Sequence, residues 1–401
     1  MEEITIIGAG ASGLMAMAKI LENAPQKKIT IIERSDKIAS KILLTGGGRC
    51  NITNAEDDIK KLLKNYPRSQ NFLKFALYDF SPKKVMEWFE ERGIPLKTEE
   101  NKRVFPVSNK ASSVKELFEK IIKDHDVNLL LNSKPKSVKK QKDHFEIQLN
   151  NEKIIKTKKL LITTGGSFNP NPLNLAFGYQ TAKNFKHKII ELKAGLTAFL
   201  SDETNDLAGL TLKNTNLTLK TKQNYKFKGD LLFTHKGISG PGIFALSSLS
   251  ADENISKNNP AIIEIDLVPD KNEEELRKKI KEKAENSKSL FSNILSIFIN
   301  KKIAKIIFPL DKKANEISKK ELNQTIEKIK KFKIQISGRV NGEEIVTIGG
   351  IDTSEINEKT MESKLCPNLF FAGEILNIDG FTGGFNLQSA WATGKVAGQN
   401  I

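Results

Sequence analysis

Three glycines, Gly8, Gly10 and Gly13, separate a short apolar segment from a stretch with helical periodicity. In such a turn the first glycine permits the tight bend, the second lets the backbone approach a pyrophosphate, and the third allows close packing of helix and strand. The N-terminus of the helix offers free N–H groups and a partial positive charge to phosphates. Glu33 follows 20 residues after Gly13, where its carboxylate can accept hydrogen bonds from ribose hydroxyls. This spacing predicts a dinucleotide-binding site.

Two further apolar segments, Leu160–Gly166 and Leu369–Glu374, end in glycine and favour FAD over NAD as the dinucleotide. A large flavin fold wraps its extended cofactor with returning segments of this kind. The glycine-rich loop Thr45–Asn51 lets a backbone approach the pyrophosphate or the flavin ring closely. The sequence contains no second complete G-x-G-x-x-G, so we predict bound FAD and only transient docking of NAD(P)H at the flavin.

A predicted helix begins at the glycine pair Gly383-Gly384. If its N-terminus points at N1 of the flavin, its dipole and free N–H groups stabilise the anionic reduced ring; the alternative is an ordinary helix that starts at glycine. Glu374, after a predicted strand, is placed to reach the ribityl hydroxyls or the flavin edge.

Two residues are candidates for proton transfer. Cys50 lies in the loop expected near the flavin ring and would act as a general acid, although cysteines are more often buried packing residues. His235 precedes a turn into a helix and would act as a proton donor or simply as a hinge residue. Arg49 would bind a phosphate, offset flavin charge or form a structural ion pair.

Hydrophobic periodicity predicts a βαβ unit at the N-terminus, with strands at 3–7 and 28–32 and a helix at 12–23 between them. Residues 68–93 and 112–124 are predicted to be helical. Predicted strands follow at 128–131, 137–140, 145–149, 154–158 and 160–163.

The second half changes character twice. Short strands after residue 192 (210–212, 216–219, 225–227, 231–233 and 261–267) suggest a small barrel or sandwich, and a charged helical block follows. We therefore predict a discontinuous α/β fold with five segments: a Rossmann-like FAD domain over 1–190, a β-barrel-like insert over 191–269, a nested helical domain over 270–330, the return of the insert over 331–345, and the rest of the FAD domain over 346–401.

Composition excludes several protein classes. The 401 residues are 38% hydrophobic, and no apolar run approaches the roughly 20 residues that cross a membrane. An acidic start that runs into a core strand predicts no cleavable leader. Two distant cysteines, Cys50 and Cys366, predict neither a disulfide framework nor a metal site, and a reducing cytoplasm is the simple location.

The formal net charge of +16 would attract RNA or anionic membranes. The alternative is compositional bias, because only 7 of the 64 basic residues are arginine and Lys, Ile and Asn are abundant throughout, as an AT-rich genome would also produce. The sequence leaves these two explanations open.

Long motifs resemble a known family. They are Lys41–Asn54, Phe105–Ser108, Leu232–Pro241, and Phe371–Glu374 with Asp379–Gln388. Together they are similar to the HI0933-like flavoproteins, also called the YhiN or BaiN type, over nearly the whole chain. One departure is Ala176-Phe177-Gly178-Tyr179, where members often have Gly-Asp-Gly-Tyr, and it puts the contact made by that loop in doubt.

The resemblance implies a glutathione-reductase-type FAD domain, a β-barrel-like insert and a small nested helical domain. Activities assigned in the family are reduction of an activated C=C bond in bile-acid intermediates, an aminoacetone oxidase, and reduction of uridine in ribosomal RNA to dihydrouridine. We expect the FAD contacts to come from Gly8, Gly10, Ala11, Ser12, Gly13, Leu14, Glu33, Arg34, Lys41, Gly46, Gly47, Gly48, Arg49, Thr164, Gly165, Gly166, Gly373, Glu374, Gly383, Gly384, Asn386 and Leu387.

Three hypotheses for function remain. The first is an FAD enzyme that reduces uridine in ribosomal RNA with NAD(P)H, favoured by the basic charge. The second is a reductase or oxidase of a small enone or amine, and the third is a non-catalytic FAD-binding interaction protein. The choice between NADH and NADPH, the substrate and the oligomeric state do not follow from the sequence.

Overall fold

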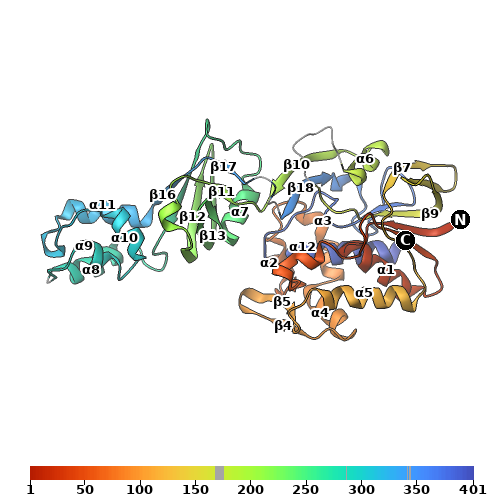
Figure 1. Cartoon of the computed structure of the whole chain (residues 1–401), viewed down its shortest axis with the longest axis horizontal. Coiled ribbons are helices and arrows are strands. Elements are labelled where there is room, and N and C mark those ends of the chain that lie inside the picture. The colour runs from red at the N-terminus through yellow and green to blue at the C-terminus, as the bar shows by residue number, and fades with distance from the viewer. Residues whose placement is uncertain (168–175, 286, 341, 343–344) are drawn as a thin grey trace. The chain divides into compact units, whose positions relative to one another are not determined.

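The computed structural model describes residues 1–167, 176–285, 287–340, 342 and 345–401. The chain forms two compact units, one of residues 1–193 with 346–401 and one of residues 194–345. In Figure 1 the ribbon of both units is coloured by residue number, from red at the N-terminus to blue at the C-terminus. The predicted α/β class with a discontinuous Rossmann-like domain is confirmed, because the first unit is assembled from both ends of the chain.

A parallel sheet forms the centre of the first unit. Its strands β1 (Glu2–Ile7), β2 (Ile29–Ile32), β6 (Asn128–Leu130), β9 (Ile154–Ile162) and β19 (Leu369–Phe371) lie in the order β6-β2-β1-β9-β19. All residues of β2 and β19 are buried, as a parallel sheet with both faces covered requires. The C-terminal strand β19 therefore enters the core of the N-terminal domain.

Strand β9 takes part in two kinds of pairing. Its first half pairs antiparallel with β8 (Phe145–Leu149), which continues to β7 (Pro135–Lys140), and its second half pairs parallel with β1 and β19. The sequence predicted two strands here, 154–158 and 160–163. They form one strand because the alternating half and the fully buried half follow each other without a turn.

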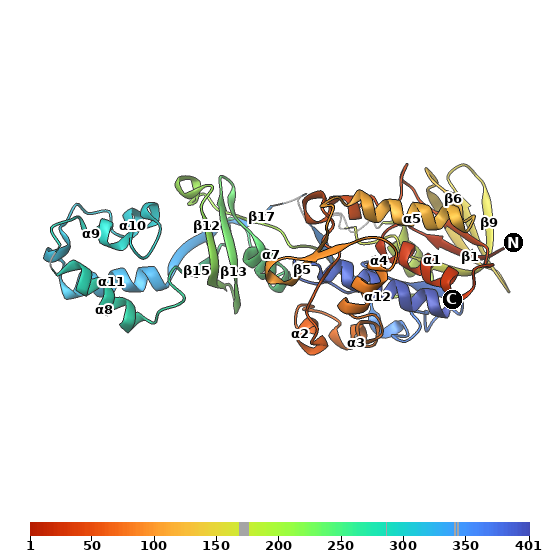
Figure 2. The ribbon, with the colours of Figure 1, turned by 90° about the horizontal axis from the view of Figure 1, so that it is seen from below.

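The helices of the first unit surround this sheet, and α1 and α12 run side by side (Figures 1 and 2). Gly394 and Gly398 of α12 make the close contact possible, since a Cβ on either would collide with the backbone of Ser12 or Ala16 in α1. The helices are α1 (Ala11–Asn23), α2 (Ile59–Leu63), α3 (Gln70–Asp79), α4 (Pro82–Glu90), α5 (Ser112–Asp124), α6 (Phe177–Asn184) and α12 (Phe385–Asn400).

Smaller elements differ from the predictions. The predicted helical stretch 68–93 is two helices, because Ser81 caps α4 and Pro82 occupies its first turn. Two small sheets were not predicted at all: β3 (Thr53–Asn54), β5 (Arg103–Pro106) and β4 (Leu96–Thr98), and the pair β10 (Ile189–Gly195) with β18 (Val346–Ile351). The strands of the first of these sheets have only two to four residues, which is too few to show alternation, and β10 and β18 do not alternate between buried and exposed residues.

The second unit is an antiparallel seven-stranded sheet with helices. The strands lie in the order β16-β15-β12-β13-β14-β11-β17. They are β11 (Phe199–Leu200), β12 (Thr211–Lys220), β13 (Asn224–Thr234), β14 (Gly237–Ser239), β15 (Ala261–Asp266), β16 (Phe332–Ile336) and β17 (Gly338–Arg339).

Within the part of the chain that the structure describes, the α-helices of this second unit are α7 (Pro241–Leu249), α8 (Glu273–Ala284), α9 (Phe291–Leu295), α10 (Lys301–Ile307) and α11 (Lys319–Lys330). Helices α8 to α11 lie between β15 and β16 in the sequence, and their apolar side chains form one continuous core with those of the sheet. Among the described residues, every helix is too short or too polar to cross a membrane.

Candidate cofactor-binding site

The turn between β1 and α1 needs glycine at two positions, because a side chain there would collide with neighbouring backbone atoms. Gly8 has φ of 109°, and a Cβ on it would lie 2.5 Å from the carbonyl oxygen of Thr163 in the neighbouring chain segment. A Cβ on Gly13 would collide with the carbonyl oxygen of Gly8. The Thr163 hydroxyl donates to the Gly8 carbonyl at 2.8 Å and so ties the turn to the end of β9.

Gly10 differs from the other two glycines because a Cβ on it would meet no atom of the described residues within 4 Å. It is the N-cap of α1 and supplies no side-chain cap, and the first turn of the helix contains no acidic residue. An Asp or Ser in this position would cap the helix with its side chain and stabilise it by roughly a few tenths of a kcal/mol relative to glycine. The missing cap leaves N–H donors and open space together, which is the arrangement that a diphosphate needs.

Glu33, directly after β2, holds the same turn from the other side. Its two carboxylate oxygens accept hydrogen bonds from the backbone N–H groups of Ala9 at 2.8 Å and Ser35 at 2.9 Å. Each carboxylate oxygen retains a lone pair that can accept from a ribose hydroxyl. Arg34 next to it is exposed. Ala11 and Leu14 lie in the first turn of α1.

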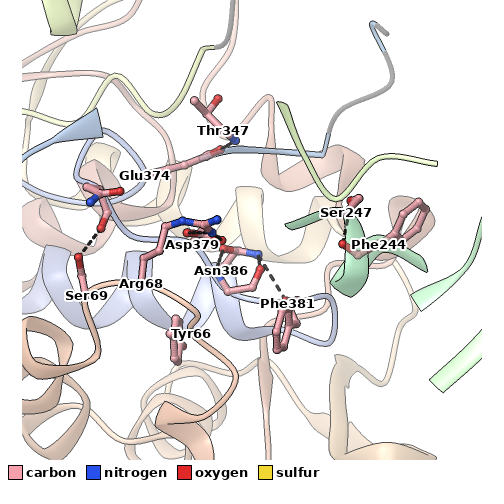
Figure 3. A network of polar contacts seen from close by, with 12 residues as sticks. Tyr66, Arg68, Ser69, Phe244, Ser247, Thr347, Glu374, Asp379, Phe381 and Asn386 are labelled. Carbon is pink, nitrogen blue, oxygen red and sulfur yellow. Dashed lines mark hydrogen bonds and ion pairs between the residues drawn. The ribbon is translucent and has the colours of Figure 1, made fainter. Parts of the chain in front are cut away.

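The segment after β19 places Glu374 in a defined position. One carboxylate oxygen accepts from the Thr347 N–H at 2.9 Å, and the other forms an ion pair with Lys41 at 2.5 Å; Figure 3 shows Glu374 beside Thr347. Gly373 must lack a side chain because Ser12 of α1 occupies that space. The Ser12 hydroxyl donates to the Ala372 carbonyl at 3.3 Å, so this predicted contact residue fastens α1 to the end of β19.

Thr164, Gly165 and Gly166 follow β9 and are half-buried beside this segment. A Cβ on Gly166 would lie 2.7 Å from a carboxylate oxygen of Glu374, whereas a Cβ on Gly165 would meet no described atom within 4 Å. Lys41, Glu374 and the segment after β9, which the sequence predicted as separate contacts, therefore lie together.

The start of α12 is held by Asn51, the last residue of the glycine-rich loop, and by Asn54 shortly after it. The Gly384 N–H donates to Asn51 at 3.0 Å in the amide orientation that satisfies this side chain, and Asn54 donates to the Gly383 carbonyl at 3.0 Å. Gly384 has φ of 99° and is the N-cap residue of α12, so no side chain accepts a hydrogen bond from the first N–H groups of the helix. The first turn also contains no acidic residue. The N-terminus of this helix is therefore positive and has no side-chain cap, and its role in stabilising an anion stays a prediction.

Asn386 and Leu387 lie in the first turn of α12. The Asn386 side chain accepts from the Gly380 N–H at 2.8 Å and donates to the Gly380 carbonyl at 2.7 Å, so it closes the preceding loop. Figure 3 shows Asn386 beside Phe381 of this loop. The Tyr66 hydroxyl donates to the Phe385 carbonyl at 2.8 Å. The side chain of Asn386 thus shapes the loop, and its contact with FAD stays a prediction.

An ion pair that the sequence did not reveal lies under this loop. Nη1 of Arg68 is 2.9 and 2.8 Å from the two carboxylate oxygens of Asp379, whose side chain is only 2% exposed (Figure 3). The Ser69 hydroxyl donates to the Asn377 carbonyl at 2.6 Å. The segment at 66–69 therefore fixes the loop that leads into α12.

The glycine-rich loop is a left-handed turn that exposes its backbone. Gly46, Gly47 and Gly48 have φ of 58°, 67° and 84° and are exposed. Cys50 also has a positive φ, but its side chain is fully buried. Burial raises the pKa of the Cys50 thiol to about 12. A thiol without access to the surface is poorly placed as a general acid, so the structure lends this prediction no support.

Arg49 is committed to protein partners. Nη1 lies 2.8 Å from a carboxylate oxygen of Glu99, and the guanidinium lies 4.0 Å from the centre of the Phe105 ring. Of the three roles that the sequence allowed for Arg49, the structural ion pair is the one observed.

His235 belongs to the second unit, in the exposed turn between β13 and β14. The helix predicted to follow this turn is α7. No protein group within the described residues hydrogen-bonds to its ring, and its role as a proton donor stays a prediction.

The fold and this site define a class: a Rossmann-like flavoprotein with a discontinuous cofactor domain. The chain belongs to the HI0933-like family, whose Rossmann-domain model matches residues 2–400. It is 31% identical to a ribosomal RNA dihydrouridine synthase of Haemophilus influenzae, covering 100% of this chain and 98% of the relative.

Two other similar proteins are informative. A 3-dehydro-bile acid delta(4,6)-reductase of Clostridium scindens is 26% identical to this chain, and the similarity covers 100% of this chain and 98% of the relative. The structure of the 3-ketosteroid delta1-dehydrogenase of Sterolibacterium denitrificans has a TM-score of 0.50 at 12% identity, covering 99% of this chain and 98% of that one. This last likeness concerns the fold alone.

A buried histidine elsewhere in the first unit has the neighbours of a catalytic triad but not its access to solvent. His187 Nδ1 lies 3.0 Å from Glu355, and Nε2 lies 2.8 Å from the Ser363 hydroxyl. The Ser363 oxygen also accepts from the N–H groups of Leu365 and Cys366 and is buried. Both ring nitrogens of His187 have a hydrogen-bond partner, and the Ser363 oxygen is buried, so we assign His187 a structural role.

We expect this histidine to make the stability of the protein depend on pH. Burial lowers the pKa of His187, although Glu355 opposes the shift. The unfolded chain therefore binds the proton more readily, and stability should be full above about pH 6.5 and fall below it. Urea unfolding midpoints from pH 8 to 5 test this, with His187→Gln as the variant that should lose part of the decline. Equal declines in both proteins would show that other groups cause it.

Proposed function

We propose that the protein is an FAD-dependent reductase of an activated C=C bond and that its substrate is uridine in ribosomal RNA, with NAD(P)H as reductant. The observation that carries this proposal is the similarity, over the whole chain, to a protein named ribosomal RNA dihydrouridine synthase. The open space beside Gly10 of this chain, where a diphosphate would bind, supports the proposal. Free cysteines and the composition favour action in the cytoplasm.

The residues of the chain divide the work of holding the cofactor. Gly10 and the first turn of α1 would bind the diphosphate, and Glu33 would accept from the adenosine ribose. Glu374, oriented by Thr347 and Lys41, would reach the ribityl hydroxyls or the flavin edge. The uncapped N-terminus of α12 would stabilise negative charge on the reduced flavin. FAD, when bound, supplies the hydride chemistry.

A small enone is the second candidate substrate. The relative from Clostridium scindens is named as a bile acid reductase, and its similarity also extends over the whole chain. Both substrates present a C=C bond conjugated to a carbonyl group, so the same flavin chemistry serves either. The difference lies in whether the protein also binds RNA.

One experiment separates these candidates. The purified yellow protein is reduced anaerobically with NADH or NADPH and then mixed with ribosomal RNA that lacks dihydrouridine, or with a small steroid enone. Reoxidation by RNA with formation of dihydrouridine supports the proposal. Reoxidation by the enone alone favours the second candidate, and a flavin that neither nucleotide reduces contradicts both.

A further inference from the structure

Positive charge is distributed unevenly within the second unit. Residues 271–331, which contain α8 to α11, carry 17 Lys and Arg against 9 Asp and Glu, a net charge of +8. The segments 194–270 and 332–345, which contain the sheet, carry 9 against 11, a net charge of −2. A compositional bias toward lysine would act on both parts alike, so it does not explain this separation.

Most lysines of this helical block have no acidic partner. Glu321 is fully used, because it accepts from both Lys312 and the backbone and hydroxyl of Ser318, and Glu285 pairs with Lys281. Ten exposed lysines make no ion pair with any described residue: Lys278, Lys279, Lys283, Lys288, Lys301, Lys305, Lys313, Lys319, Lys320 and Lys331.

Several of these lysines stand where they oppose folding. Lys301 and Lys305 are four residues apart on α10, and a like-charge pair at this spacing destabilises a helix by about 0.2–0.5 kcal/mol. Lys319 and Lys320 are the first two residues of α11, where the helix dipole disfavours cations by about 0.3–1 kcal/mol each. Helix stability therefore does not account for them, whereas an anionic partner would.

We propose that the block formed by α8 to α11 binds the phosphate backbone of the RNA substrate, an inference that rests on the proposed function. Lysine ammonium groups act as point charges that contact phosphates without reading bases. The block thus supplies affinity that does not depend on sequence, and the choice of the reacting uridine is left to residues outside it. RNA is favoured over an anionic membrane because a relative that matches this chain from end to end is named for ribosomal RNA.

Two matched variants test this inference. The first is K301Q/K305Q/K319Q/K320Q in the helical block. The second is K213Q/K222Q/K226Q/K228Q, which removes four exposed lysines that form no ion pair with a described residue, from β12, β13 and their connecting turn in the same unit. Each variant removes the same charge. A single exposed substitution usually changes stability by about 0.5 kcal/mol or less, and the helical variant should be stabilised because it removes unfavourable charges from α10 and α11.

Binding of the full-length, FAD-loaded proteins to protein-free ribosomal RNA is measured over a range of salt concentrations. For the helical variant we expect the slope of log K against log salt to fall by about 3 and the affinity to fall at least about tenfold. The sheet variant should bind like the unchanged protein. K301Q/K305Q and K319Q/K320Q alone should each give about half the effect, which guards against misfolding of the quadruple variant.

The remaining outcomes overturn the inference in identifiable ways. Equal loss in both quadruple variants would mean that only net charge matters. Loss of binding to phosphatidylglycerol vesicles without loss of RNA binding would assign the block to membranes. If the unchanged protein binds RNA and forms dihydrouridine while the helical variant does both equally well, only this inference fails. If the unchanged protein does neither, the proposed function fails.

Discussion

A protein carrying Gly10→Asp should be colourless and yet more resistant to heat than the unchanged protein stripped of FAD. A Cβ at this position meets no atom of the described residues within 4 Å, and φ of −88° suits any residue. Aspartate is a preferred N-cap, so its side-chain cap should stabilise α1 by roughly a few tenths of a kcal/mol relative to glycine, and its charge at the positive end of the helix should add about 0.3–1 kcal/mol. The same carboxylate would occupy the place of the diphosphate and repel it. We expect FAD affinity to fall at least about 100-fold, or about 2.7 kcal/mol.

The test is specific because Gly10→Asp should lower FAD affinity and at the same time raise the stability of the FAD-free protein. Flavin absorbance and titration calorimetry report FAD binding, and thermal unfolding of the FAD-free proteins reports stability. Gly10→Ala serves as the control, because it adds bulk without charge or a cap and should weaken FAD binding less. A yellow Gly10→Asp protein with unchanged affinity would show that the diphosphate does not lie at this turn.

The cofactor cradle was predictable because its determinants are local. Gly8, Gly10 and Gly13 follow from a backbone geometry that spans six residues, and the expected helix at 12–23 agrees with α1 to within one residue. Glu33 follows from the length of one βαβ unit. The start of α12 at Gly384 was predictable for the same reason, since a glycine pair precedes a long helical stretch.

The supports of the site were not predictable because they join residues that lie far apart in the sequence. Asp379 was noticed only as part of a motif, and nothing in its surroundings indicates Arg68, more than 300 residues earlier. The Thr53 hydroxyl donates to Gln388, which donates to the Phe80 carbonyl, and no local pattern predicts either bond. A signal did exist for one contact: Gly394 and Gly398 are four residues apart, a spacing that allows close helix packing.

The direction in which a side chain points explains why Cys50 and Arg49, next to the glycine-rich loop, were harder to interpret. The neighbours of Cys50 in the sequence suggested catalysis, but its thiol points into the protein. The position of Arg49 allowed phosphate binding, compensation of flavin charge or a structural ion pair, and its guanidinium pairs with Glu99, which also lies near Lys97 and Arg103. Residue type and position suggest which groups approach a cofactor, but only the packing determines which way a side chain turns.

The ion pair under the α12 loop should contribute more to stability than any other side-chain contact of the cofactor site. Arg68→Met removes the cation and leaves the buried Asp379 carboxylate without the Arg68 guanidinium that neutralises its charge. Breaking a buried pair in this way costs about 3 kcal/mol or more. For a domain of this size the thermal midpoint should fall by roughly 6 °C or more, measured on the FAD-free protein.

A second substitution shows whether the loss of stability in R68M comes from the negative charge of the buried Asp379 carboxylate. Asp379→Asn keeps the shape of the side chain but removes its charge, so the double variant R68M/D379N should regain a large part of the stability lost in R68M. Because Asp379 leads into the loop that Asn386 closes, FAD affinity should follow the same order: unchanged protein, then the double variant, then R68M. Additive losses in the double variant would contradict this, because two independent contacts, and not one buried pair, would then hold the loop in front of α12.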